Sequence, residues 1–168
     1  DFCGMFYEGS ARVRLDGKWN YIGNDGKMLL DVWFDYCQAF SDGFGVVVLN
    51  GKCNYIGKDG KVLSSTWLDD CYDFSDGFAR VRLNGKWNYI GKKGKYLSDV
   101  WTDGCGYFYE GFTVVVLNGK WNYIGKDGKV LSDVWFDWCD TFKEGFGRVK
   151  LNDKWLYIDK EGGLHEYR

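Results

Sequence analysis

Cysteines have the widest chemical range of the residues in this chain, because a thiolate can bind a metal, form a disulfide or act as a nucleophile. Zinc sites combine closely spaced cysteines, as in C-x-x-C, with further cysteine or histidine. The chain has no such pair, and its one histidine is His165. Cys53 stands alone in the sequence, whereas the other five cysteines recur every 34 residues: Cys3, Cys37, Cys71, Cys105 and Cys139.

These five cysteines form an odd, evenly spaced set. In a regular array each would have two equivalent neighbours, so the five cannot all pair. We therefore predict no disulfide, no metal site and no cofactor, and interpret the cysteines as small buried hydrophobic residues between aromatic ones. Six free thiols would favour a reducing compartment such as the cytoplasm.

Recurring aspartates are the second set that could do chemistry, since paired carboxylates perform acid–base catalysis and glycoside hydrolysis. Catalysis needs a singular pocket, whereas these aspartates repeat in front of every aromatic–cysteine stretch. We interpret them as hydrogen-bond acceptors for turns or backbone, and predict that the chain is not an enzyme. They are Asp1, Asp35, Asp69, Asp103 and Asp137.

The same 34-residue period runs through the whole chain. It links Lys18, Lys52, Lys86, Lys120 and Lys154, and no insertion breaks the register. We predict a single repeat array, 1–168, built from the repeats 1–34, 35–68, 69–102, 103–136 and 137–168.

Composition limits the class of protein. Aromatic residues make up 20% of the chain, with 24 glycines and no proline, which excludes collagen-like and disordered chains. A net charge of −2 argues against a nucleic-acid partner, and no apolar run approaches the ~20 residues of a membrane span.

Within each repeat the pattern is that of strands. In "FARVRLNGKWNYIG", 78–91, two alternating runs flank Asn84-Gly85, a dipeptide typical of a two-residue type I′ turn. A second turn at "GKKG" or "GKDG" would fold the next segment back as a third strand, with a short fourth strand following it. The sequence predicts an all-β chain of short antiparallel meanders, which must stack to bury their apolar faces.

The motif F-x-E/D-G-F-A-R-V-x-L-N-G-K-W-x-Y-I-x-K-D-G-K resembles the WG (or KWG) repeat of bacterial and phage proteins. The glycine of that family's Trp-Gly pair is replaced here by Asn20, Asn54, Asn88 and Asn122, and by Leu156 in the last repeat. The resemblance implies a β-repeat array with an interaction role. The hairpins are also similar to choline-binding cell-wall repeats, whose period is nearer ~20 residues.

Two arrangements of the repeats stay open. We favour an open, β-solenoid-like array over a five-bladed β-propeller, because propeller blades usually need ~40 residues and the last repeat departs from the others. The recurring asparagine also has two interpretations, a ladder of amides stacked from repeat to repeat or a bond to nearby backbone.

Aromatic hairpins are the best functional signal. Repeats 1, 3 and 5 place a basic residue on each side of a central Val. Repeats 2 and 4 place Val at both of these positions. Basic and apolar bands would therefore alternate beside the Trp and Tyr of each hairpin. On odd repeats Arg82 would face Trp87 and Arg80 would face Tyr89. The alternation fits duplication of a two-repeat block, interlocking of neighbours, or a surface for a partner.

We predict a non-enzymatic scaffold that binds a protein or is structural, with glycan or cell-wall binding as the alternative, no nucleic-acid partner, and possible self-association through open array ends. The candidate interaction surface comprises Arg12, Arg14, Val46, Val48, Arg80, Arg82, Trp87, Tyr89, Val114, Val116, Trp121, Tyr123 and Arg148.

Overall fold

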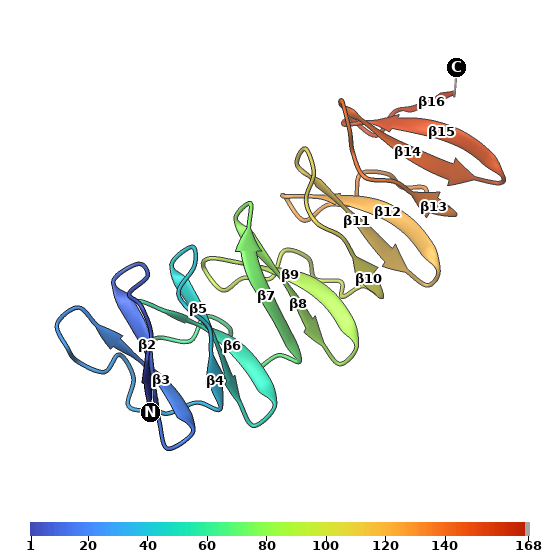
Figure 1. The fold of residues 1–168 in the computed structure, drawn as a ribbon. Coiled ribbons are helices and arrows are strands. Elements are labelled where there is room, and N and C mark those ends of the chain that lie inside the picture. Colours follow the sequence, from blue (N-terminus) through green and yellow to red (C-terminus); the bar gives the residue numbers. More distant parts are fainter. Residues whose placement is uncertain (167–168) are drawn as a thin grey trace. The chain divides into compact units, whose positions relative to one another are not determined.

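The computed structural model describes residues 1–166, which form sixteen β-strands in five antiparallel sheets (Figure 1). No helix occurs in this range, so none there could cross a membrane. The prediction of an all-β chain with one meander per repeat is confirmed. The choice between an open array and a propeller remains a prediction.

Each repeat contributes a first strand, of two residues in four repeats and six in repeat 3, followed by a hairpin of two six-residue strands. The first strands are β1 (Phe2–Cys3), β4 (Tyr36–Cys37), β7 (Asp70–Ser75), β10 (Gly104–Cys105) and β13 (Trp138–Cys139). The second strands are β2 (Ser10–Leu15), β5 (Phe44–Leu49), β8 (Phe78–Leu83), β11 (Phe112–Leu117) and β14 (Phe146–Leu151). The third strands are β3 (Lys18–Gly23), β6 (Lys52–Gly57), β9 (Lys86–Gly91), β12 (Lys120–Gly125) and β15 (Lys154–Asp159), and the last repeat adds β16 (Leu164–Glu166).

The hairpin turns follow the predicted chemistry. Asn50 and Gly51 both have positive φ, 52° and 75°, as a type I′ turn requires. Leu49 then pairs with Lys52, and the alternation that follows is in the predicted register throughout β5 and β6. Local turn geometry therefore sets which side chains share each face of the sheet.

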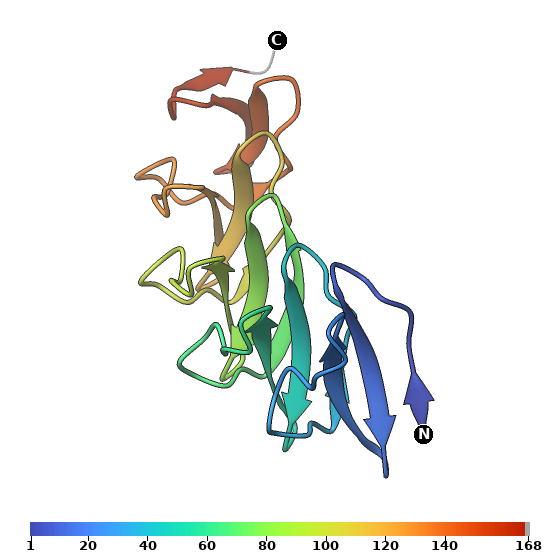
Figure 2. The ribbon, with the colours of Figure 1, turned by 90° about the vertical axis from the view of Figure 1, so that its left-hand side faces the viewer.

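The predicted third strand after the hairpin is wrong for repeats 1 to 4. The segment after each GKDG-type turn makes an isolated bridge, as between Ile56 and Val62, rather than a strand. It becomes a strand in repeat 5, where β16 pairs with β15 (Figure 2). The strand that completes each sheet instead precedes the hairpin. It contains the cysteine that recurs every 34 residues, termed the ladder cysteine below, and it hydrogen-bonds to the first of the two hairpin strands.

The chain divides into two compact units. The N-terminal unit comprises residues 1–84 and 89–95, and the C-terminal unit comprises 85–88 and 96–168. Their cores use the same positions of the repeat, three repeats apart. The N-terminal core contains Tyr21, Phe34, Cys37, Phe40, Val47 and Ile56, and the C-terminal core contains Tyr123, Phe136, Cys139, Phe142, Val149 and Ile158.

A buried tyrosine joins adjacent repeats in both cores. The Tyr21 hydroxyl donates a hydrogen bond to the Gln38 carbonyl of the next repeat at 2.6 Å. An alanine Cβ at Gly45 would lie 2.3 Å from that hydroxyl oxygen, so this tyrosine fits only against a glycine. Tyr123 packs against Gly147 in the same way, and its hydroxyl donates to the Asp140 carbonyl. In these two hairpins the tyrosine is thus covered by the following repeat.

The prediction of buried, unpaired cysteines is correct for two residues and wrong for two others. The predicted burial is also wrong for Cys3, which is exposed, and Cys105 is half-buried. Cys37 and Cys139 are buried, and burial raises the pKa of their thiols to about 11 and about 12, which disfavours a reactive thiolate. Cys53 and Cys71, however, form a disulfide with Cα atoms 6.1 Å apart.

The pairing arises because Cys53 stands where other hairpins carry Trp, so a thiol meets the ladder cysteine of the next repeat. Four cysteines are free, not six, and the argument for a reducing compartment loses its premise.

The recurring asparagine bonds nearby backbone, and the amide-ladder alternative is wrong. Asn54 is fully buried, donates to the Ser64 carbonyl at 2.8 Å and accepts from the backbone N–H groups of Tyr55 and Ser64. Asn20 and Asn122 make the equivalent bonds to Leu30 and Ser132. The amide holds the loop after its own hairpin, a task that glycine at this position could not perform.

Candidate interaction surface

Four of the five recurring aspartates have both carboxylate oxygens in use. Asp35 Oδ2 accepts the Asn50 N–H of its own hairpin turn at 2.7 Å, while Oδ1 binds the Lys18 ammonium of the preceding repeat. Lys18 and then the Asn50 N–H hold the pKa of Asp35 below its usual range. The same arrangement recurs at Asp69, Asp103 and Asp137. Their prediction as backbone acceptors is confirmed, and each also clamps two repeats together.

Aromatic side chains line up in one column in each unit. In the N-terminal aromatic column the ring centroids of Phe2 and Trp19 are 5.8 Å apart, and those of Trp19 and Tyr36 are 5.9 Å apart. Phe2 and Tyr36 keep more than two-fifths of their surface exposed. The column therefore joins repeats 1 and 2 along a partly solvent-accessible strip.

The C-terminal aromatic column consists of three indoles. Trp121 and Trp138 lie 5.8 Å apart and Trp138 and Trp155 lie 5.9 Å apart, the latter pair edge to face. Trp155 is 39% exposed. The guanidinium of Arg148 lies 4.5 Å from the Trp155 ring centroid, a cation–π distance.

Arginines cover the aromatic columns in odd repeats. In repeat 1 the guanidinium groups of Arg12 and Arg14 lie 5.4 and 5.6 Å from the Trp19 ring, so the predicted contact of Arg with the cross-strand Trp occurs there. The predicted Arg82–Trp87 and Arg80–Tyr89 contacts of repeat 3 stay predictions, and both arginines have further partners there. Arg80 lies 4.5 Å from the Tyr72 ring, and Arg82 forms an ion pair with Asp70.

The candidate surface is correct in part. Three of its residues, Val46, Tyr89 and Tyr123, are buried and cannot contact a partner. They were predicted to be exposed because alternation places them opposite the apolar core, but both faces of a hairpin are covered once repeats stack. Arg14 and Arg148 are exposed. The others are partly buried: Arg12, Val48, Arg80, Arg82, Trp87, Val114, Val116 and Trp121.

Sequence reasoning missed five members of the columns: Phe2, Trp19, Tyr36, Trp138 and Trp155. The signal was present for three of them, because the residue before each ladder cysteine pairs with the hairpin's first strand next to the indole. Phe2 pairs with Arg14, and Trp138 pairs with Lys150. Without the pairing of that short strand, these residues belonged to no predicted face.

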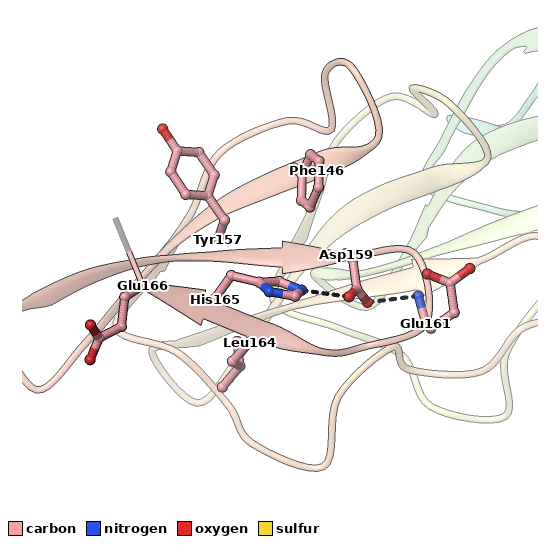
Figure 3. Close-up of a pocket in the computed structure, with 7 residues that line it drawn as sticks. All are labelled: Phe146, Tyr157, Asp159, Glu161, Leu164, His165 and Glu166. Carbon is pink, nitrogen blue, oxygen red and sulfur yellow. Dashed lines mark hydrogen bonds and ion pairs between the residues drawn. The ribbon is translucent and has the colours of Figure 1, made fainter. Parts of the chain in front are cut away.

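A pocket of about 930 Å³ opens beside β15 and β16 (Figure 3). The Asp159 carboxylate lies 2.6 Å from His165 Nε2 and accepts the backbone N–H groups of Glu161 and Gly163. His165, then the Gly163 N–H, hold the pKa of Asp159 below its usual range. Phe146 and Tyr157 form its apolar side.

The sequence profile described as "WG containing repeat" matches residues 1–19, 21–53, 55–87, 89–121 and 123–155. The chain belongs to the WG-repeat family. The resemblance drawn from the hairpin motif is thereby confirmed. The buried asparagine explains the departure from the family's Trp-Gly pair, since here the amide fastens the loop that follows the hairpin.

No curated protein matches the sequence. Among solved structures, the chain is similar to Kluyveromyces lactis Hsv2 at 11% identity and a TM-score of 0.42, covering 94% of this chain and 59% of that one. It is also similar to the computationally designed protein Ika4 (15% identity, TM-score 0.39, 84% of this chain and 99% of that one). A third match is the extracellular domain of BT4673 from B. thetaiotaomicron (10% identity, TM-score 0.39, 98% and 28%).

Proposed function

We propose that this WG-repeat chain is a non-enzymatic scaffold that binds a partner protein through its C-terminal aromatic column. The observation that carries the proposal is the strip of Trp121, Trp138 and Trp155 with Arg148 on the outermost ring. Tryptophan and arginine are the residues most enriched at the energetic centres of protein interfaces. Partly exposed rings held edge to face by neighbours also lose little side-chain entropy when a partner binds.

The non-enzymatic part of the proposal is supported by the use of the acidic groups. Four of the five recurring aspartates each bind a lysine and a turn N–H, and Asp159 accepts hydrogen bonds from the β15–β16 turn. A carboxylate committed in this way cannot move to exchange protons with a substrate without loosening the contact between repeats.

Glycan binding is the second candidate for the same rings. Sugars stack on the open face of an aromatic ring, and here Arg148 covers one face of Trp155 while Trp138 and Trp155 pack edge to face. This arrangement favours a protein partner, so a glycan is treated as an alternative outcome of the test.

The test begins with crosslinking capture from a lysate of the source organism, followed by binding measurements with the purified partner. We expect Trp155→Ala and Arg148→Ala to weaken binding by at least about tenfold, as at interface hot spots. Trp19→Ala, in the N-terminal column, is the matched control and should leave the affinity within about twofold if the C-terminal column is the site.

The proposal fails if the Trp155 and Arg148 variants, folded by circular dichroism, keep wild-type affinity. A glycan array with binding that disappears in Trp155→Ala, together with no captured protein, would instead establish the glycan alternative.

A further inference from the structure

A second surface lies in the N-terminal unit, between the turn after β6 and the turn after β9. These turns flank a groove of about 420 Å³. Phe44, Val62 and Leu63 supply its apolar side, and Asp59 is its one acidic lining residue. Four lysines line what we term the basic groove: Lys58, Lys61, Lys92 and Lys93.

Lys93 sets this groove apart from the equivalent turns. At the same position Asp25, Asp59 and Asp127 each accept, at 3.0 Å, the backbone N–H of the residue two places on. A lysine side chain has no acceptor, so repeat 3 gives up this turn-stabilising bond and gains a positive charge. Repeat 3 is the one repeat of five that places a positive charge at this position, which indicates a use for that charge.

The neighbouring lysine also lacks the arrangement found in other repeats. Lys58 and Lys160 lie 3.7 and 3.1 Å from Glu8 and Glu110, the acids in the turns of earlier repeats. In repeat 2 that turn carries Asp42, one methylene shorter than glutamate. Lys92 lies over the ring of Phe74 instead, 5.9 Å from its centroid, as Lys126 lies over Phe108 in repeat 4, and Lys92 lines the groove.

We propose that the basic groove binds an acidic segment of a protein, with carboxylates on Lys92 and Lys93 and an apolar side chain against Phe44, Val62 and Leu63. The apolar lining suits a peptide better than a polyphosphate backbone, and the net charge of −2 opposes binding of an extended nucleic acid. The groove belongs to the N-terminal unit, so this site is independent of the C-terminal aromatic column.

The experiment uses a fluorescein-labelled ten-residue peptide of glutamate with every third residue leucine, titrated with the whole chain while polarisation is measured. We expect saturable binding that weakens as sodium chloride rises. Lys93→Asp should weaken it by at least about tenfold, since the charge that faces the carboxylates is reversed. The same substitution restores the turn acceptor, so its melting temperature should be at least that of the wild type.

Lys129→Asp, in the turn of repeat 4, is the matched control because it makes the same charge change outside the groove. Its affinity should stay within about twofold of the wild type. An equal loss in both variants would show general charge attraction and overturn the groove. Absence of peptide binding would do so as well.

Single-stranded DNA of twenty nucleotides is the second probe. Binding of the DNA with the same Lys93 dependence, and tighter than that of the peptide, would overturn the assignment to an acidic protein segment. The Lys93→Asp chain should still bind the partner captured through the aromatic column. Loss of peptide binding alone therefore separates failure of this site from failure of the proposed function.

Discussion

Two successive contacts between repeats in the N-terminal unit use the same positions and hold them in different ways. Between repeats 1 and 2, Tyr21 bonds the Gln38 carbonyl above Gly45, and Trp19 meets the Tyr36 ring. Between repeats 2 and 3, Tyr55 bonds the Tyr72 carbonyl at 2.5 Å, and the disulfide of Cys53 with Cys71 replaces the aromatic contact.

The backbone differs accordingly. Repeat 3 has Ala79 where repeat 2 has Gly45, and β7 is longer than β4, with a register shift between Cys71 and Phe74. A bulge of this kind moves a strand relative to its partner. The comparison indicates that the position of Gly45 can carry a Cβ in another repeat when the neighbouring strand bulges.

Repeats 4 and 5 follow the first pattern. Tyr123 sits above Gly147, and Trp121 meets Trp138. The contact between repeats 2 and 3 is therefore a variant of a common design, in which a covalent bond holds what ring packing holds elsewhere.

The largest expected effect is loss of that covalent bond. Cys53→Ser should lower the free energy of unfolding by about 3 kcal/mol, because the disulfide closes a short loop in the unfolded chain. The separation of its cysteines is 18 residues. Denaturant unfolding with and without reductant measures the effect, and reductant should destabilise the wild type but not Cys53→Ser.

Cys105→Ser is the control for the disulfide, since Cys105 is free and its variant should keep the wild-type response to reductant. Alkylation of unreduced, denatured protein should label four cysteines. Six labels would contradict the disulfide. The contact between repeats 2 and 3 would then have no covalent bond, like the contact between repeats 1 and 2.

The second effect tests a feature that both contacts share. Asn54→Leu should cost about 2 to 3 kcal/mol, because the Ser64 carbonyl and N–H and the Tyr55 N–H lose a buried partner. Repeat 5 naturally carries Leu156 at this position, and Leu156→Asn should change stability by less than about 1 kcal/mol. Equal losses in the two variants would show that the amide has no special role in its loop.

The third effect concerns the residue that faces the tyrosine, Gly45 in repeat 2 and Ala79 at the same position of repeat 3. Gly45→Ala should cost about 1 to 2 kcal/mol through overpacking against the Tyr21 hydroxyl, whereas Ala79→Gly should cost about 1 kcal/mol or less. Adding Tyr21→Phe to Gly45→Ala should recover part of the loss, since it removes the clashing oxygen. Thermal unfolding compares the two single variants and the double variant. An unchanged melting temperature in Gly45→Ala would show that glycine is not required beside Tyr21.

The smallest effect concerns the lysine–aspartate clamps, which both contacts have. Lys18 and Lys52, followed by turn N–H groups, lower the pKa of Asp35 and Asp69 in the folded chain. A lowered folded pKa adds stability that is complete above the unfolded value of about 4 and is lost as pH falls through the folded pKa.

Melting temperature should therefore decline below about pH 4, and Asp35→Asn and Asp69→Asn should each flatten the decline to a similar degree. Unequal flattening would show that the clamp differs between the two contacts.

Much of the local structure was predictable. The alternation around Asn-Gly pairs predicted the hairpins and their register because turn geometry and side-chain alternation depend only on neighbouring residues. The backbone role of Asp35 and its equivalents was predicted from repetition alone. The strand that completes each sheet was misplaced, since the segment after the hairpin and the segment before it carry equally weak strand signals.

The sequence by itself therefore determined the repeat, the hairpins and the family. Tertiary structure decided which residues meet between repeats. Cys53 and Cys71 form a disulfide between two repeats. Alternation places Tyr123 on the hairpin face opposite the apolar core, yet its side chain is buried. Such contacts depend on the size of the groups that face each other once repeats stack: a thiol in place of an indole allows a disulfide, and a glycine beneath a tyrosine allows a buried hydroxyl. Periodicity alone carries no information on either.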